Sequence, residues 1–281
     1  MEEREKIIEI EVERLREFKH HPFHVRDDTE MRLLKESIRE YGILSPLIVR
    51  PVLEGVYEII SGHRRKWAAE QLGYSKLPVI IRMMTDEESV IAMVDSNLQR
   101  EKISFSEKAF AYKMKNEALK QKCGRKSSRS GHRLKGKKTI EIIGEACGDS
   151  PKQVQRYIKI TELIPELLQL LDKGMIGFSP AVEIASLKPE EQKQLIDAMD
   201  YAQSSPSLSQ AQRMKKMSQE GTLNTTRMQD IMCEIKKGEI SRVTFTNEQL
   251  HRFFPGDYTA EKMKREILEI LKIWMERYLE K

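Results

Sequence analysis

The sequence predicts an α+β protein: a small mixed α/β amino-terminal domain, then an all-helical domain, then a small, mostly helical carboxy-terminal domain. Three observations predict this order. Short apolar runs alternate with helical patterns up to about residue 100, strand patterns nearly vanish after Phe105, and a Ser-rich segment follows Tyr201. The expected boundaries are 1–103, 104–200, a linker over 201–222, and 223–281.

In the amino-terminal domain, Ile8, Ile10 and Val12 alternate with glutamates, which is typical of a half-buried strand. Gly42 and Gly73 are expected to end helices. Apolar runs predict further strands, and helical spacing predicts helices between them: strands over 47–51, 56–60 and 77–81, and helices over 29–41, 64–72 and 86–99.

The helical domain is predicted to begin with an amphipathic helix over 106–121. From Lys122 to Lys138 the chain carries eight Lys or Arg and no acidic residue, and we expect a mobile basic loop from Cys123 to Lys138. Helices are then expected from Thr139 to about Met199. The remaining predicted elements are a polar helix over 209–220, a short strand over 242–246 and an amphipathic helix over 259–279.

Composition excludes several classes of protein. Net charge is +5, with 33% charged and 39% hydrophobic residues, which fits modest cores and exposed helices. No apolar run approaches the roughly 18 residues of a membrane span, and the first residues are too acidic for a signal peptide. The three cysteines have no zinc-binding spacing, and His20, His21 and His24 fit a loop better than a metal site. We therefore expect a cytoplasmic protein with no membrane partner.

The segment from Tyr57 to Ala69 predicts a strand, a one-glycine turn at Gly62, and a helix that opens with Arg64 and Arg65. Backbone N–H groups at a helix start and guanidinium groups both bind phosphate. Positive side chains at this end of a helix are unfavourable without an anion. A phosphate site is the interpretation we favour, and surface arginines at a helix start are the alternative.

A second motif lies within residues 139–160. Ile140, Ile143 and Cys147 form the apolar face of one helix, Gly148-Asp149 forms a tight turn, and Ser150 to Gln153 can cap a second helix with a capping box. The second helix turns Val154, Tyr157 and Ile158 inward and leaves a polar face of Lys152, Gln153, Gln155, Arg156 and Lys159.

This polar face predicts a helix-turn-helix whose second helix reads the DNA major groove. An αα-hairpin with a solvated polar face is the alternative. The basic segment upstream favours DNA binding because it could follow phosphates, through Arg125, Lys126 and Arg129.

Four segments, in order, resemble the ParB family of DNA-partition proteins. Ser61 to Ala69 resembles the family's Gly-Glu-Arg-Arg box, and Ser96 to Glu101 its Glu-Asn-Leu-Gln-Arg-Glu box. Leu47 to Pro51 resembles the family's first strand, and Gln153 to Leu168 its DNA-binding helices. The resemblance covers about Ile8 to Met199.

This resemblance implies a ParB/sulfiredoxin-like amino-terminal domain and a nucleoid-associated homodimer that loads on a site in double-stranded DNA. Such a protein binds CTP with Mg²⁺, closes into a clamp, and works with a ParA-type ATPase in the partition of a chromosome, plasmid or mobile element. Carried over by position, Asn97 would hold Mg²⁺ through its side-chain oxygen. The nucleotide would lie against Gly62, His63, Arg64, Arg65, Arg100 and Glu101.

His63 and Ser96 depart from the family pattern, because each stands where the family has Glu. Asp95 cannot replace the second carboxylate, since one helical step turns the side chain by about 100°. The missing carboxylates bear on metal geometry and water activation, so CTP binding is expected while hydrolysis and catalytic residues stay open. The alternative function is a transcriptional or nucleoid-occlusion regulator with the same fold and no nucleotide hydrolysis.

The carboxy-terminal helix also leaves two interpretations. One stripe along it is apolar, which is typical either of a core or of a dimer surface. Its residues are Met263, Ile267, Leu271, Trp274 and Tyr278.

Overall fold

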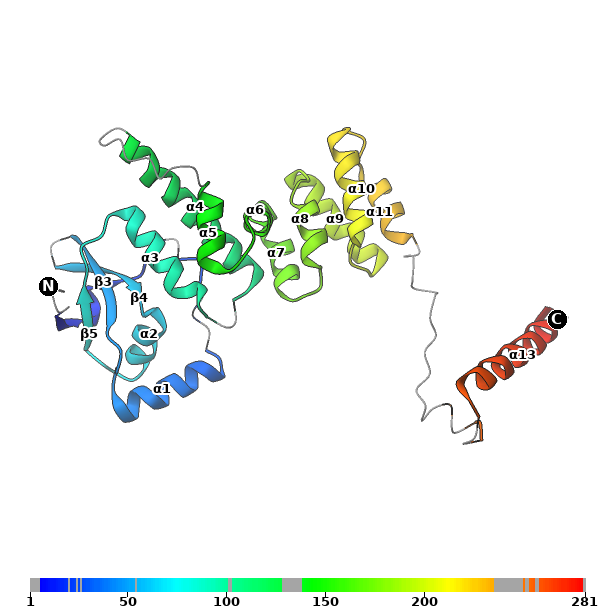
Figure 1. The fold of residues 1–281 in the computed structure, drawn as a ribbon, viewed down its shortest axis with the longest axis horizontal. Helices are drawn as coiled ribbons and strands as arrows, with labels where there is room; N and C mark the ends of the chain where they lie inside the picture. The colour runs from blue at the N-terminus through cyan, green and yellow to red at the C-terminus, as the bar shows by residue number, and fades with distance from the viewer. Residues whose placement is uncertain are drawn as a thin grey trace. The chain divides into compact units, whose positions relative to one another are not determined.

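The structure is a computed structural model (Figure 1). It describes residues 6–19, 21–23, 25, 27–53, 55–100, 103–127, 138–234, 250, 253–255 and 258–279. The chain divides into two compact units, Met1–Cys233 and Glu234–Lys281, which are described separately.

The first unit opens with a mixed five-stranded sheet in the order β1-β5-β3-β4-β2. The pairs β1–β5 and β3–β4 are antiparallel, whereas β3–β5 and β2–β4 are parallel. The expected α/β domain is confirmed, and the sequence missed only the two-residue strand β2. The strands are β1 Ile7–Glu11, β2 Leu15–Arg16, β3 Leu47–Leu53, β4 Val56–Ser61 and β5 Lys76–Ile81, with a 3-10 turn at Val12–Arg14.

Helices lie on both faces of this sheet: α2 His63–Gln71 on one and α3 Asp86–Leu98 on the other, while α1 Thr29–Tyr41 packs against α2. Adjacent strand residues point to opposite faces. Ile59 accordingly joins a core with Ala69 of α2, whereas Ile60 joins a core with Met93 and Val94 of α3. The sheet therefore holds α2 and α3 on opposite faces, while the start of α2 and the end of α3 reach a common edge.

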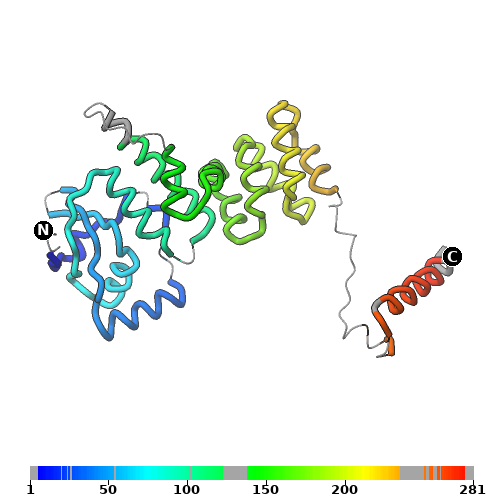
Figure 2. The backbone as a smooth tube through the Cα atoms, viewed as in Figure 1, coloured from blue at the N-terminus to red at the C-terminus, as the bar shows by residue number. Residues whose placement is uncertain are grey.

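Among the described residues of the same unit eight helices follow, and Figure 2 traces them along the chain. One apolar core runs through them, from Ala109 and Tyr112 to Ile231 and Met232. The helices are α4 Phe105–Ser127, α5 Thr139–Cys147, α6 Pro151–Ile160, α7 Pro165–Asp172, α8 Phe178–Ile184, α9 Pro189–Ala202, α10 Leu208–Gln219 and α11 Thr225–Cys233.

The linker expected over 201–222 is wrong. Ser207 caps α10 in a capping box with Gln210, and the buried Ala211 and Met214 join the core of the preceding helices. The Gln210 side chain also donates a 2.6 Å hydrogen bond to the Ile231 carbonyl of α11. Residues 208–233 therefore belong to the helical part of the first unit.

The mobile basic loop expected from Cys123 to Lys138 also needs correction at its start, because α4 continues to Ser127. The backbone of Arg125 and Lys126 is helical there, and Arg129 lies outside the described residues. The strand expected over 242–246 also lies outside them.

The second unit contains α13, Ala260–Leu279. Met263 is buried, whereas Leu271 and Trp274, in the predicted apolar stripe, are 53% and 59% exposed. The choice between core and dimer surface therefore stays a prediction for this helix. Among the described residues of both units, no helix is long and apolar enough to cross a membrane.

Candidate functional site

One cavity of about 270 Å³ lies where the start of α2 meets the end of α3. It brings together every predicted nucleotide-binding residue that the structure describes, as well as Asn97; Glu101 lies outside the described residues. The lining consists of His21, Phe23, Val25, Leu34, Ser61, Gly62, His63, Arg64, Arg65, Ser96, Asn97 and Arg100.

Gly62 makes the turn between β4 and α2, and the position requires glycine. Its φ is 108°, in the left-handed region that other residues rarely adopt. A Cβ atom there would lie 2.7 Å from Cγ of Leu47 in β3 and 3.2 Å from Nη2 of Arg65. The helix start is therefore packed directly against the sheet, with its first N–H groups at the cavity.

Arg64 is held by the start of α1. Its Nη1 donates to Oε2 of Glu30 at 3.1 Å, and its Nη2 donates to Oδ1 of Asp28 at 3.2 Å. These carboxylates supply the negative charge that the sequence argument assigned to an external anion. The positive helix end therefore does not, on its own, require a phosphate.

Arg65 is fixed to the segment before β3. Its Nη1 donates to the carbonyl oxygen of Pro46 at 2.9 Å and to that of Ser45. Burial lowers the pKa of this guanidinium. Arg65 therefore holds the cavity wall to the sheet.

Arg100 differs from both of these arginines. Within the described part of the chain, its guanidinium has no hydrogen-bond or ion-pair partner. Burial, followed by the positive charge of Arg64, lowers its pKa, although Glu107, Glu30 and Asp28 act in the opposite direction. A bound anion would relieve this cost of holding a half-buried cation.

His63 forms part of the wall as a neutral side chain. Its Nε2 accepts a 3.4 Å hydrogen bond from the Phe18 backbone N–H, and its ring lies 4.0 Å from that of His21. Burial, and then the nearby charges of His21, Lys66 and Arg100, lower the pKa of His63 to about 3. It therefore has no acid–base role near neutral pH.

Asn97 presents a possible oxygen ligand to the cavity. Its Nδ2 donates to the Met93 carbonyl at 2.9 Å, which leaves Oδ1 as an acceptor. Asp95 instead pairs with Lys115 of α4 and does not line the cavity. Among the described residues, no group of three or more His, Cys, Asp or Glu could hold a metal. A cation held by Asn97 would take its further ligands from water or from a bound phosphate.

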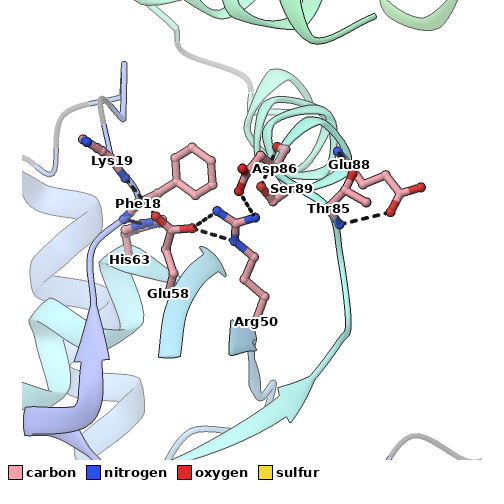
Figure 3. Close-up of polar contacts among 9 residues, drawn as sticks. All are labelled: Phe18, Lys19, Arg50, Glu58, His63, Thr85, Asp86, Glu88 and Ser89. Atoms are coloured by element: carbon pink, nitrogen blue, oxygen red, sulfur yellow. Dashed lines mark hydrogen bonds and ion pairs between the residues drawn. The ribbon is translucent and has the colours of Figure 1, made fainter. Parts of the chain in front are cut away.

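A charge network that centres on the largely buried Arg50 and Glu58 was missed by the sequence reasoning (Figure 3). Arg50 of β3 donates to Glu58 of β4 through Nε at 2.7 Å, and through Nη1 to Asp86 of α3 at 2.7 Å. Glu58 also accepts from the Lys19 backbone N–H, next to the Phe18 N–H that holds His63. The network thus connects the starts of α3 and α2. The sequence offered one signal for this network: Arg50 and Glu58 are opposite charges in two apolar strands that were predicted to be neighbours.

Two helices, α5 and α6, joined by a short turn occupy the segment predicted to be a helix-turn-helix. Ser150 caps α6 by accepting a 3.2 Å hydrogen bond from Gln153 N, but the Gln153 side chain does not complete the capping box and instead accepts from Arg156 Nη1 at 3.3 Å. Gly148 adopts a φ of 73° in the turn. At Gly144, a Cβ would collide with the carbonyl oxygen of Asp149, so the two helices approach closely.

The polar face of α6 is only partly open to solvent. Lys152 and Gln155 are exposed, whereas Lys159 pairs with Glu162 at 2.6 Å. Arg156 donates to Oγ of Ser179 at 2.7 Å, and its Cζ lies 4.9 Å from the centre of the Phe178 ring. A cavity of about 380 Å³ along this face is lined by Ser150, Lys152, Gln153, Arg156, Ser179, Glu183, Leu208 and Gln212.

Parts of the chain are similar to known proteins. Residues 1–98 match the family model of the ParB N-terminal domain. A nucleoid occlusion protein of Oceanobacillus iheyensis is 29% identical over 204 residues, which is 67% of this chain and 71% of that protein. Residues 1–98 therefore form a ParB N-terminal domain. A second similar protein, a nucleoid occlusion protein of Bacillus thuringiensis, is 35% identical over 173 residues, which is 59% of this chain and 60% of that protein.

Two solved structures are also similar. One is the C-terminally truncated chromosome-partitioning protein ParB from Caulobacter crescentus complexed to the centromeric parS site, with 21% identity and a TM-score of 0.42 over 80% of this chain and 98% of that one. The other is the truncated ParB complexed with CTP-gamma-S, with 26% identity and a TM-score of 0.32 over 68% and 99%.

Proposed function

We propose that this protein binds double-stranded DNA as a homodimer and uses CTP with Mg²⁺ as a switch that closes it into a clamp. One observation carries the proposal: the start of α2 and the last turn of α3 line the same cavity. Residues of two motifs that are distant in the sequence, 61–69 and 96–101, meet in this cavity. The guanidinium of Arg100 lies among them, and the described residues provide no hydrogen bond for it.

The chemistry of each residue supports a role toward a nucleoside triphosphate. The N–H groups at the start of α2 and the guanidinium of Arg100 would bind phosphate oxygens. Arg64 would join them, and Oδ1 of Asn97 would be one of the oxygen ligands of Mg²⁺. Arg65 and Gly62 would hold the wall against β3. Bound Mg²⁺ would neutralise phosphate charge in the cavity.

We further propose that CTP acts as a ligand more than as a substrate. Neither His63, which is neutral, nor Ser96 offers a carboxylate to activate water. Asp95 is directed to Lys115 of α4. In this function the protein would serve the segregation of a replicon, with a ParA-type ATPase as partner.

DNA would be bound by α6, supported by the end of α4. Exposed Lys152 and Gln155 and the oriented Arg156 have the hydrogen-bonding groups that contact phosphates and base edges. Lys159 and Gln153 would contribute at the edges of the same face, and Arg125, Lys126 and Arg129 would contact the backbone.

A second function is a DNA-binding regulator that acts in nucleoid occlusion. The observation that favours it is the name of the two relatives, both of which are nucleoid occlusion proteins. As a regulator without a nucleotide switch, the protein would bind its DNA site equally well with and without CTP.

Calorimetric titration with CTP and Mg²⁺, with and without a DNA site selected from a random pool, tests the proposal. Arg100→Ala is expected to weaken CTP binding roughly ten- to a hundredfold, as for a lost charged hydrogen bond. Arg39→Ala, an exposed arginine on α1, is the matched control and should not change it. CTP should also retain the protein on closed circular DNA but not on linear DNA. A wild-type protein that binds no CTP in either condition would leave the regulator as the function.

A further inference from the structure

The cavity contains an arginine, Arg64, whose two terminal nitrogens each donate a hydrogen bond to an acid of the same chain. Both terminal nitrogens of Arg64 are engaged, one by Glu30 and the other by Asp28. These are the groups with which a guanidinium binds a phosphate in a two-pronged geometry. A phosphate that approaches the edge of the guanidinium formed by Nη1 and Nη2 therefore competes with this carboxylate pair for the same donors.

Asp28 and Glu30 are placed for this contact by the start of α1. Asp28 is the N-cap of the helix and accepts a 2.8 Å hydrogen bond from Met31 N, and Glu30 lies in the first turn. Both side chains are well exposed, at 44% and 59%, whereas that of Arg64 is 23% exposed. Exposed ion pairs of this kind are weak, so they can exchange with a better anion.

We propose that Asp28 and Glu30 act as a built-in competitor of the nucleotide phosphate, binding Arg64 when the cavity holds no nucleotide and releasing it when a polyphosphate enters. This rests on the proposed function, in which Arg64 binds phosphate. The competitor lowers affinity for every anion but favours multiply charged ones, because only these offer enough contacts with Arg64 and Arg100 to displace two carboxylates. It also links phosphate binding to the position of α1.

The test is calorimetric titration with CTP and, separately, with inorganic triphosphate, both with Mg²⁺. The variants are Asp28→Asn, which keeps a good N-cap, Glu30→Gln, and the two combined. The matched control is Glu36→Gln, an exposed acid further along α1. The combined variant is expected to bind triphosphate roughly 3- to 30-fold more tightly, which corresponds to removing two weak ion pairs. The control should bind as the wild type does.

Adding Arg64→Ala to the combined variant distinguishes competition for Arg64 from a purely structural role of the two acids. If the acids act through Arg64, this substitution abolishes the gain, and the double-mutant cycle shows coupling. The gain should also shrink at high salt, because exposed charge pairs are screened. If the combined variant melts well below the wild type, the triphosphate affinity of Glu30→Gln alone tests the proposal, since this variant keeps the N-cap Asp28.

The outcomes separate this inference from the proposed function. Unchanged or weaker triphosphate binding by the variants overturns the competitor, even when wild-type protein binds CTP. Tighter triphosphate binding with no CTP binding supports the competitor and overturns the CTP switch. If no variant binds either anion, both are overturned.

Discussion

The hydroxyl group of Tyr112 in α4 donates a 2.7 Å hydrogen bond to Oδ2 of Asp149, in the turn between α5 and α6. Nζ of Lys108, one turn earlier in α4, lies 2.8 Å from the same oxygen. The rings of Tyr112 and of Tyr157 in α6 meet edge to face, with centroids 5.6 Å apart. One carboxylate thus joins α4, the helix that follows the cavity, to the predicted DNA-binding helices.

Asp149→Asn is predicted to destabilise the protein by about 1–3 kcal/mol at pH 7, because it removes a charged hydrogen-bond acceptor from two donors. Burial acts to raise the pKa of Asp149, but hydrogen bonds from Lys108 and Tyr112 outweigh it, so the pKa is lowered. The contribution is therefore present above the unfolded pKa of about 3.9 and is lost as the pH falls through the folded value. Urea unfolding at pH 7 and at pH 3 measures this difference, which should be smaller at pH 3. An equal difference at both values would contradict the assigned role.

Gly144→Ala is predicted to destabilise the helix-turn-helix by about 1–3 kcal/mol, as overpacking does. The new Cβ would collide with the Asp149 carbonyl oxygen, which is backbone and cannot move aside independently of the turn. Gly177→Ala is the control, because its φ is −70° and its nearest new contact is 3.4 Å from a proline side chain. Thermal unfolding of the two variants should separate them clearly, and equal melting temperatures would show that the turn can adjust.

Local sequence patterns predicted most elements of the first unit. Gly42 and regular apolar spacing predicted α1, and its observed bounds agree with the predicted ones; the N-cap Asp28 is seen only in the structure. The two-residue strand β2 was missed because it is too short to show alternation. A linker over 201–222 was predicted from the Ser and Pro content of residues 201–209. Instead, Ala211 and Met214 are buried in the core of the preceding helices, so α10 packs with them.

The candidate site shows the same limit at the level of single residues. The sequence predicted which residues gather at the cavity, since both motifs are local. It could not show the partners of Arg64, which lie 34 and 36 residues away on α1. For the same reason the helix-dipole argument overestimated the need for an external anion. Contacts between distant segments depend on the tertiary fold, which periodicity does not encode.

The two ion pairs of Arg50 are predicted to differ in strength. Arg50→Met leaves Glu58, whose side chain is 10% exposed, without its main partner and should cost about 3–5 kcal/mol. Asp86→Asn removes a partner that is 87% exposed and should cost less than about 1 kcal/mol. Chemical denaturation of both variants tests this order. A large loss in Asp86→Asn would show that the start of α3 depends on this pair.

His63 is predicted to stay neutral in the folded protein down to about pH 3. Its folded pKa is lower than the unfolded value of about 6.5, so its contribution to stability is present above pH 6.5 and is lost as the pH falls toward 3. Between pH 7 and pH 5 the loss should be about 2 kcal/mol. His63→Gln should unfold with a weaker pH dependence over this range, and NMR should show no titration of the His63 ring between pH 5 and 8. A ring that titrates near pH 6.5 would mean that the site is open to water.

Two residues of α6 are predicted to contribute differently to DNA binding. Arg156 is oriented by Ser179 and Phe178, as a side chain that contacts one base must be, whereas Lys152 is exposed and suited to a phosphate. Arg156→Ala should therefore weaken binding to the selected site by about 1–3 kcal/mol and relax its sequence preference. Lys152→Ala should weaken binding to all sequences and reduce the salt dependence by about one phosphate contact. Fluorescence anisotropy on specific and random DNA over a salt series measures both effects. Ser179→Ala keeps Arg156 but removes its hydrogen-bond partner, so its DNA affinity should fall between those of the wild type and Arg156→Ala. If Arg156→Ala has wild-type affinity and sequence preference, this face of α6 is not the recognition surface.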